Sequence, residues 1–291
     1  YKGYTIQPYS PGAGTGLSSH ELNQPGCYRD VKDTTVTAQF AIPTEDWKAL
    51  AEKANLPKET WGKPCFVAWT TTPWTLPSNV ALCVGPKIEY VIVETYNPYD
   101  AEKLTLVMAA SRVAAYLKSE GEITDGGELP EYERGDKYVP YRIVGRVMGT
   151  ELEGLHYQQL MPWVKPVEQT GDFAPKFVND YAAAHPEKVF TSEDGRDKFV
   201  EMESEAFRII LGDYVTTDDG TGIVHIAPTF GADDAKVAKD ANIPALYLIS
   251  KKGQTRPMVD LQGKYFTIDE LDQNFVKACV DGKGNWHHSG E

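Results

Sequence analysis

Short apolar runs dominate the hydrophobic pattern of the chain, and most of them have the length and composition of β-strands. Residues 34–42 (TTVTAQFAI) alternate and are rich in β-branched side chains, whereas residues 65–70 (CFVAWT) form a continuous apolar run. Similar runs predict further strands at residues 80–84, 90–94, 104–109, 138–147, 207–215, 222–227 and 246–250. The pattern therefore predicts a chain in which strands outnumber helices.

Helical signals are fewer. Thr44 is the expected N-cap of a helix over residues 45–54, because acidic residues fill the turn that follows it. Further helices are predicted at residues 111–119, 177–184, 230–241 and 269–280. The rest of residues 150–196 has poor periodicity and predicts long irregular excursions. Because the strands come in clusters and do not alternate strictly with helices, we predict an α+β fold with a mixed, barrel-like β-sheet core and surrounding helices.

Composition divides the chain into three parts. Residues 1–33 begin with a stretch rich in Gly, Pro, Ser and Asn, and we interpret them as a connecting segment. Residues 34–280 hold the predicted strands and helices and form the main domain. Residues 281–291, with His287 and His288, are polar and are interpreted as a trimmed or joined tail. The chain starts without a methionine or a signal-peptide pattern, so we expect a piece of a longer chain.

The acidic balance of the chain limits how it can bind partners. Its formal net charge is −13, and proteins hold nucleic acids mainly through basic surfaces. We therefore expect an RNA ligand to be held mainly elsewhere, with only its end entering this chain. The composition is that of an ordinary soluble protein, and no apolar stretch approaches the roughly 20 residues that span a bilayer. We predict a cytoplasmic location and no membrane partner.

The cysteines give no pattern of a metal site or of a disulfide scaffold. The four are Cys27, Cys65, Cys83 and Cys279; they form no CxxC pair, and no histidine stands beside them at ligand spacing. Cys65 and Cys83 lie in apolar runs, where a free cysteine behaves as a small hydrophobic residue. We therefore expect no zinc, no other metal and no cofactor, and a reducing compartment.

The first segment with candidate chemistry is residues 69–79, WTTTPWTLPSN. Three threonines precede Pro73, where a strand stops because proline has no amide hydrogen for the ladder. One interpretation is simply an edge strand that ends at a proline. The other is a binding surface, since a strand end leaves amides and hydroxyls without ladder partners. Threonine hydroxyls donate and accept, which suits an ester, a ribose or a water.

The second segment is residues 219–234, DGTGIVHIAPTFGADD. Its GTG is a turn into a strand and only weak evidence for nucleotide binding, because no helix follows it directly. His225 lies within that strand, where the pattern is compatible with a packed histidine as well as a functional one. Asp233 and Asp234 open the next helix, where a carboxylate caps the helix or offsets its dipole. At the mouth of a pocket, the same carboxylate would pair with a cation such as an α-ammonium group.

Motifs for a protein nucleophile or a phosphate loop are missing from the sequence. The chain contains no GxSxG, no HExxH and no GxxxxGK[ST], and no Cys–His pair indicates a thiol hydrolase. If the chain is a hydrolase, this favours a mechanism in which it positions the substrate and a water.

Together, WTTTPWTLPSN and GTGIVHIAPTFGADD resemble the paired signature of the editing insertion in the class I aminoacyl-tRNA synthetases for isoleucine, valine and leucine. TTTPWTLP is similar to the isoleucyl enzyme, whereas the valyl and leucyl relatives typically have TTRP there. The opening YKGYTIQPYSPGAGTGLSSHE and the later LQGKYF also resemble the isoleucyl insertion, so the likeness covers most of the chain. The resemblance implies that residues 1–33 lead in from the synthetase core and that residues 34–280 are the editing domain.

The resemblance also implies roles for individual residues. Asp234 resembles the acid that holds the α-ammonium group of the substrate. Thr70, Thr71 and Thr72 resemble the threonines around the scissile ester and the terminal adenosine, and with Asp234 they are the expected catalytic set. Three further residues are expected to contact the substrate. Trp74 resembles a wall of the pocket, and Asn79 matches a position linked to editing. His225 resembles the residue that makes the pocket too small for isoleucine.

The implied reaction is hydrolysis of valine mischarged onto tRNA(Ile), and hydrolysis of valyl-adenylate before transfer is left open beside it. A synthetic site rejects valine poorly, because one methylene in an apolar pocket is worth only about 1–3 kcal/mol; isoleucyl-tRNA synthetase is itself the standard illustration of this limit. The implied partners are the 3′ end of charged tRNA(Ile), the valine moiety or valyl-adenylate, and the remainder of the synthetase with its ATP-binding ligase core.

The sequence departs from some relatives and leaves alternatives open. Ser10-Pro11-Gly12-Ala13 stands where some relatives carry a CxxC zinc pair, so no zinc ribbon is expected. The HIGH-like and KMSKS-like motifs of the ligase core are absent, so this chain is not expected to form aminoacyl-adenylate. A docking insert that binds the tRNA end without hydrolysis fits the same residues. Editing for a different synthetase is disfavoured by TTTPWTLP.

Overall fold

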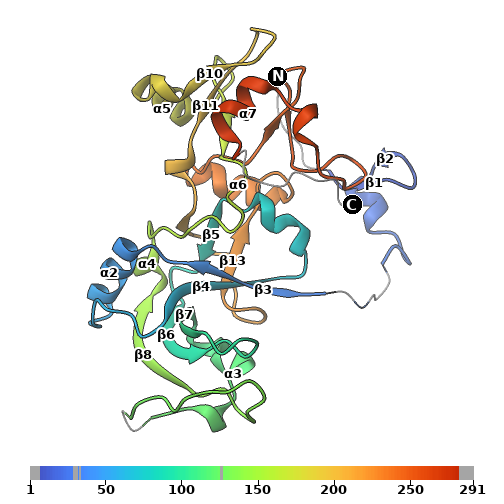
Figure 1. Ribbon diagram of the computed structural model, residues 1–291. Coiled ribbons are helices and arrows are strands. Elements are labelled where there is room, and N and C mark those ends of the chain that lie inside the picture. Colours follow the sequence, from blue (N-terminus) through green and yellow to red (C-terminus); the bar gives the residue numbers. More distant parts are fainter. Residues whose placement is uncertain (1–6, 29–31, 33, 125–126, 282–291) are drawn as a thin grey trace.

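The computed structural model describes residues 7–28, 32, 34–124 and 127–281. Its largest sheet has five strands in the order β3-β4-β7-β6-β8 (Figure 1). Strands β4 and β7 are parallel and the other neighbours are antiparallel, so the sheet is mixed. Its strands are β3 (Val36–Ala41), β4 (Lys63–Thr70), β6 (Glu89–Tyr96), β7 (Lys103–Ala109) and β8 (Tyr141–Met148).

Both faces of the five-stranded sheet are covered, which explains its continuous apolar runs. Ile92 of β6 belongs to the main core together with Trp47 and Leu50 of helix α2 (Thr44–Lys53). Its neighbour Val91 points to the opposite face, because side chains alternate along a strand, and packs with Val113 of helix α3 (Val113–Tyr116). The two helices therefore bury opposite faces of the same strands.

A second, three-stranded sheet has the order β12-β5-β13 and joins the main core. Strand β5 (Ala81–Val84) is buried at every position and pairs in parallel with β12 (Arg208–Leu211) and antiparallel with β13 (Ile223–Ile226). Helix α6 (Ala232–Asp240) follows β13 after a short turn. This arrangement brings the ends of the two motif segments toward one another from distant parts of the sequence.

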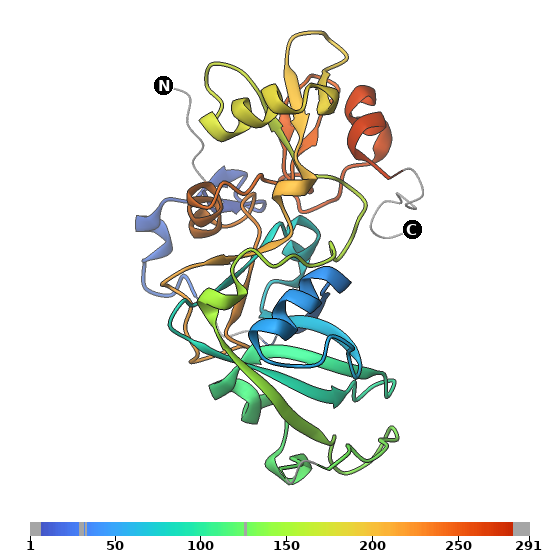
Figure 2. The same cartoon turned by 90° about the vertical axis from the view of Figure 1, so that its left-hand side faces the viewer.

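The upper part of the molecule in Figure 1 is a smaller lobe around the antiparallel sheet β10-β11-β9 (Figures 1 and 2). Its elements are β9 (Val167–Gln169), α5 (Lys176–Ala184), β10 (Val189–Thr191), β11 (Lys198–Glu201), β14 (Leu248–Ile249), β15 (Thr255–Arg256) and α7 (Gln273–Cys279). The remaining short elements are β1 (Tyr9–Ser10), β2 (Thr15–Gly16), α1 (Ser19–Leu22) and α4 (Gly149–Leu152).

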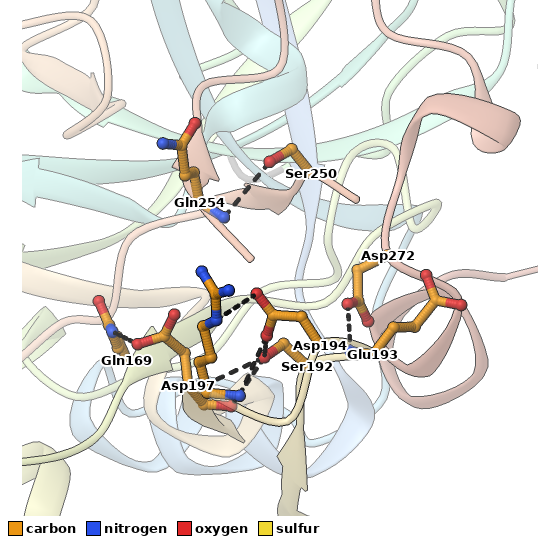
Figure 3. Close-up of polar contacts among 9 residues, drawn as sticks. Gln169, Ser192, Glu193, Asp194, Asp197, Ser250, Gln254 and Asp272 are labelled. Carbon is orange, nitrogen blue, oxygen red and sulfur yellow. Dashed lines mark hydrogen bonds and ion pairs between the residues drawn. The ribbon is translucent and has the colours of Figure 1, made fainter. Parts of the chain in front are cut away.

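The fully buried Asp272 carboxylate ties this lobe together (Figure 3). Its Oδ1 accepts the amides of Asn274 and Phe275 at the start of α7, and its Oδ2 accepts the amide of Glu193 at 2.6 Å. In the same turn, the Ser192 hydroxyl donates to Asp194 at 2.7 Å. These acidic groups already have protein donors, so they hold the turn after β10 against α7.

The structure corrects several expectations. The mixed sheet is confirmed, but the barrel-like core is wrong: among the described residues β3 and β8 remain the edges of an open sheet, because β13 pairs with β5 in a separate sheet. Thr44 is the first residue of α2, and Pro43 occupies the N-cap without a side-chain bond. Helix α7 starts later than expected, at Gln273.

Other expectations concern the less regular parts of the chain. Residues 150–196 contain α5 as predicted, but also β9 and β10, which their poor periodicity concealed. The described residues include no helix long and apolar enough to cross a membrane. The division into residues 1–33, 34–280 and 281–291 stays a prediction. Most of the predicted tail, with His287 and His288, lies outside the described residues.

Candidate functional site

A cavity of about 340 Å³ lies where the end of β4, strand β13 and helix α6 meet. It brings together five of the predicted site residues: Thr70, Thr71, Thr72, His225 and Asp234. The rest of the lining comes from β4, from the loop between β12 and β13, and from the start of β13: Trp69, Tyr214, Thr216, Asp219, Gly220, Thr221, Gly222, Ile223 and Val224. Residues more than 140 positions apart in the sequence therefore share one cavity.

The threonines lie where β4 gives way to the short 3₁₀ helix Pro73–Ser78. The amide of Thr72 donates to the buried hydroxyl of Thr70 at 3.0 Å, and the two hydroxyl oxygens are 3.2 Å apart. Thr75 donates its hydroxyl to the carbonyl of Thr72 at 2.8 Å. Pro73 ends the ladder, and these local bonds satisfy the groups that the strand no longer pairs. The hydroxyl of the exposed Thr71 remains available at the rim.

His225 is buried in β13, with 8% of its surface exposed, and its Nε2 lies 3.1 Å from the hydroxyl oxygen of Thr75. That hydroxyl lies closer to the carbonyl oxygen of Thr72, at 2.8 Å, so the geometry favours Thr75 as the acceptor and the tautomer of His225 with its proton on Nε2. The Nδ1 of His225 is buried without a partner among the described residues. Burial lowers the pKa of His225 to about 4, so the ring is neutral near pH 7.

Asp234 lies in the first turn of α6, but it does not cap that helix. Its Oδ2 accepts the amide of Ala227, seven residues earlier, at 2.8 Å, while Gly231 occupies the N-cap without a side-chain bond. Burial is the main cause that raises the pKa of Asp234, the Ala227 amide lowers it, and the charge of Asp233 raises it. No cation contributes to that shift, so the carboxylate faces the cavity without a positive partner among the described residues.

The opposite wall is the loop before β13, and Arg112 holds it. The Arg112 guanidinium donates to the carbonyls of Gly220 at 2.8 Å, Asp218 at 3.0 Å and Thr217 at 3.4 Å. Gly220 has a φ of +64° and lies against Trp69, where an added Cβ would stand 3.1 Å from the indole. Glycine is therefore needed there for its backbone conformation and for the close approach.

The base of the same loop is fixed to three strands of the five-stranded sheet. The hydroxyl of Thr221 donates to the carbonyl of Val67 in β4 at 2.6 Å, and its own carbonyl accepts the amide of Ala109 at 2.9 Å. The buried Tyr90 of β6 donates to the carbonyl of Gly222 at 2.6 Å. These bonds explain why the turn GTG enters β13 at this point, and they need no nucleotide.

Trp74 and Asn79 lie outside the cavity lining. Trp74 is 53% exposed on the 3₁₀ helix that follows the threonines. Asn79 is buried; its Nδ2 donates to the carbonyl of Ala81 at 2.9 Å, and its Oδ1 accepts the hydroxyl of Tyr157 at 2.6 Å. The contacts of Asn79 join the first motif to β5 and to the core, whereas its link to editing stays a prediction.

Nine of the lining residues were not predicted as site residues, and the aromatic and charged ones among them are Trp69, Tyr214 and Asp219. Trp69 and Asp219 stand at the outer ends of the two motif segments, so their position beside the other site residues was a usable signal. Tyr214 carries no such signal, because only the path of the loop after β12 places it there. The described residues contain no group of three or more His, Cys, Asp or Glu side chains arranged to hold a metal ion.

Three curated proteins show how similar this chain is to known sequences. The isoleucine–tRNA ligase of Bacteroides thetaiotaomicron is 56% identical over 281 residues, which cover 97% of this chain and 21% of that protein. The isoleucine–tRNA ligase of Porphyromonas gingivalis is 48% identical, over 97% of this chain and 21% of that protein. The enzyme of Treponema denticola is 35% identical, over 97% of this chain and 22% of that protein. This chain belongs to the isoleucyl-tRNA synthetase family.

The chain spans about a fifth of the length of the curated synthetases it matches. No family model matches it. Among solved structures, the editing domain of the P. knowlesi cytosolic leucyl-tRNA synthetase has a TM-score of 0.43 at 14% identity, covering 72% of this chain and 63% of that one. The corresponding P. falciparum domain has a TM-score of 0.42 at 9% identity, covering 79% and 77%.

Proposed function

We propose that this synthetase segment is an editing hydrolase that removes valine mischarged onto tRNA(Ile). The observation that carries the proposal is the partly buried Asp234 carboxylate, which faces a cavity shared with the Thr70–Thr72 hydroxyls and has no cationic partner among the described residues. An aminoacyl ester offers the complementary groups, a cationic α-ammonium beside a polar ester. Family membership supports the same assignment, because it supplies the tRNA and the amino acid.

In this proposal, Asp234 anchors the ammonium group of the substrate. A burial-raised pKa means that the ionised carboxylate is poorly solvated, so an incoming cation is bound in a charge-assisted hydrogen bond. The bond from the Ala227 amide to Oδ2 fixes the direction of the carboxylate and leaves Oδ1 for the ligand. Asp234 thereby holds the substrate by the ammonium group on its α-carbon.

The threonine edge then places the ester. Thr71 and Thr72 line the cavity beside the buried Thr70, so their hydroxyls offer donors and acceptors to the ester, to the ribose and to a water. A water adds to the ester carbonyl, the bond between the acyl carbon and the ribose oxygen breaks, and that oxygen takes a proton. The acid formed releases its proton to solvent, leaving valine and a free ribose hydroxyl.

Catalysis in this scheme comes from holding the ester and the water in a reactive geometry. The neutral His225 closes the side of the cavity at β13, and its burial leaves it little room to move. We propose that this ring admits the valine side chain and excludes isoleucine. The size of that discrimination, about 1–3 kcal/mol per methylene, is enough for a second sieve when the first has already acted.

The proposal is tested by incubating this chain with Val-tRNA(Ile) and following loss of the ester against a buffer control. Hydrolysis is expected, and it should also occur when the parent synthetase is used. A chain that binds the charged tRNA without hydrolysing it would support the docking insert instead. Preferential hydrolysis of an aminoacyl ester on a different tRNA would assign the module to another synthetase.

A further inference from the structure

The charges around the cavity have one sign. Two of the lining residues are acidic, Asp219 and Asp234, and the described lining contains no Lys or Arg. Asp233 adds a third carboxylate beside Asp234 and raises its pKa. The whole chain is also acidic, with a net charge of −13.

The cation nearest to this wall in the hydrogen-bond network is committed elsewhere. Arg112 donates to the carbonyls of Thr217, Asp218 and Gly220, and it is not among the lining residues. Its Nε and Nη1 groups therefore hold the loop that presents Asp219, and the side chain does not line the cavity. Lys236 follows Asp234 by two residues in α6, which places it on a different side of that helix.

Free and esterified amino acids differ in charge, and this cavity distinguishes the two forms. Both carry an α-ammonium group that suits Asp234. The ester has a neutral carbonyl at the other end, whereas the free amino acid has a carboxylate. In a cavity with two carboxylates and no cation in its lining, that second anion meets repulsion and finds no charged partner.

We propose that the cavity selects amino acids joined as esters or amides over free amino acids by charge, with Asp219 as the specificity-determining residue at its exposed side. This inference rests on the proposed function and extends it to product release. Hydrolysis turns a ligand with one positive charge into a zwitterion whose carboxylate forms beside Asp219 and Asp234. The product is expelled, and free valine does not compete with the ester.

The test titrates this chain at pH 6.5 with valinamide, valinol and free valine, and follows the backbone amide signals of the lining residues by NMR. Valinamide and valinol carry the ammonium group without a carboxylate and are not esters. Both are expected to bind at least tenfold more tightly than valine. Raising the ionic strength should narrow the difference, because salt screens the exposed Asp219.

Two variants assign the effect to one residue. Asp219→Asn should tighten valine binding and reduce the preference for valinamide by a factor of roughly three to ten. Asp218→Asn is the matched control, since Asp218 is exposed, adjacent and outside the lining, and it should leave the preference nearly unchanged. Equal effects of the two variants would show a general surface charge and overturn the role of Asp219.

Equal affinities for valine and valinamide, or binding of neither, would overturn the selection by charge. These outcomes are separate from failure of the proposed function, which is judged by loss of the ester from Val-tRNA(Ile). Hydrolysis together with equal affinities would keep the editing function and remove this inference. Selective binding of valinamide without hydrolysis would keep this inference and remove the editing function.

Discussion

The two sides of the cavity are built in different ways. Thr70, His225 and Asp234 stand on β4, β13 and α6, and each is fixed by buried partners or by backbone amides. The facing loop has no regular structure across the residues that Arg112 holds, and that one side chain supplies three of its hydrogen bonds. The comparison indicates that the rigid side sets the chemistry, while the loop side sets access and charge.

The largest expected effect lies on the rigid side. Asp234→Asn keeps an acceptor for the Ala227 amide but removes the charge that we propose binds the ammonium group. A hydrogen bond to a charged group is worth about 1.5–3 kcal/mol, so the kcat/KM for Val-tRNA(Ile) hydrolysis should fall roughly ten- to a hundredfold. Asp233→Asn is the control, since Asp233 is exposed and outside the lining, and a loss of similar size there would contradict the anchor.

The second prediction concerns pH and the stability of the rigid side. The pKa of His225 is lowered from 6.5 to about 4 by burial, so the unfolded chain takes up this proton first as pH falls. Above pH 6.5 His225 is neutral in both states and does not change the free energy of unfolding. Between pH 6.5 and 4 only the unfolded chain binds the proton, so the free energy of unfolding falls. The loss should reach about 3 kcal/mol in urea titrations. A His225→Asn variant with the same loss across that range would contradict this origin.

The third prediction concerns the hydrogen bond that orients His225. Thr75→Val keeps the shape of the side chain but leaves the buried Nε2–H of His225 without its acceptor, at a cost of about 1–3 kcal/mol. We expect ¹⁵N NMR to show the Nε2–H tautomer in the native chain and its loss in the variant. The preference for valine over isoleucine esters should fall about fivefold and return in Thr75→Ser. An unchanged tautomer in Thr75→Val would remove Thr75 from this role.

The smallest expected effect lies on the loop side. Arg112→Met removes the three hydrogen bonds to the loop, so amide hydrogen exchange should become faster at residues 217–220. The KM for Val-tRNA(Ile) should rise about three- to tenfold, with little change in kcat. Arg112→Lys should be intermediate, because an ammonium group cannot span three carbonyls as a guanidinium does. A change in kcat equal to that of Asp234→Asn would show that the two sides are not separable.

The same contrast explains what could be predicted from the sequence. The strands around Cys65–Thr70 and Ile223–Ile226 can be predicted because buried strands are short apolar runs in the sequence. The two motif segments, residues 69–79 and 219–234, contain most of the residues that line the cavity. Tyr214 could not be found in this way, since loops carry no periodicity. The open sheet could not be predicted either, because the pairing of strands depends on contacts between residues distant in the sequence. A single sequence does not show which strands pair.

Individual side chains show the same limit. Thr44 and Asp234 have the residue types and positions of helix caps, yet neither forms the capping bond; Asp234 instead reaches back to Ala227 before the helix begins. Asn79 uses its side-chain amide on Ala81 and Tyr157, and its expected contact with substrate stays a prediction. Local pattern identifies candidates, but the three-dimensional partners decide what each polar group does.

The most direct measurement of the central claim compares Val-tRNA(Ile) and Ile-tRNA(Ile) as substrates of this chain at equal concentration. The account predicts rapid loss of the valine ester and at least about tenfold slower loss of the isoleucine ester, because the proposed scheme has Asp234 anchoring both esters and His225 leaving room only for the smaller side chain. Equal rates for the two esters would contradict the pocket-size argument. Hydrolysis of neither above the buffer rate would contradict the assignment of hydrolysis to this cavity.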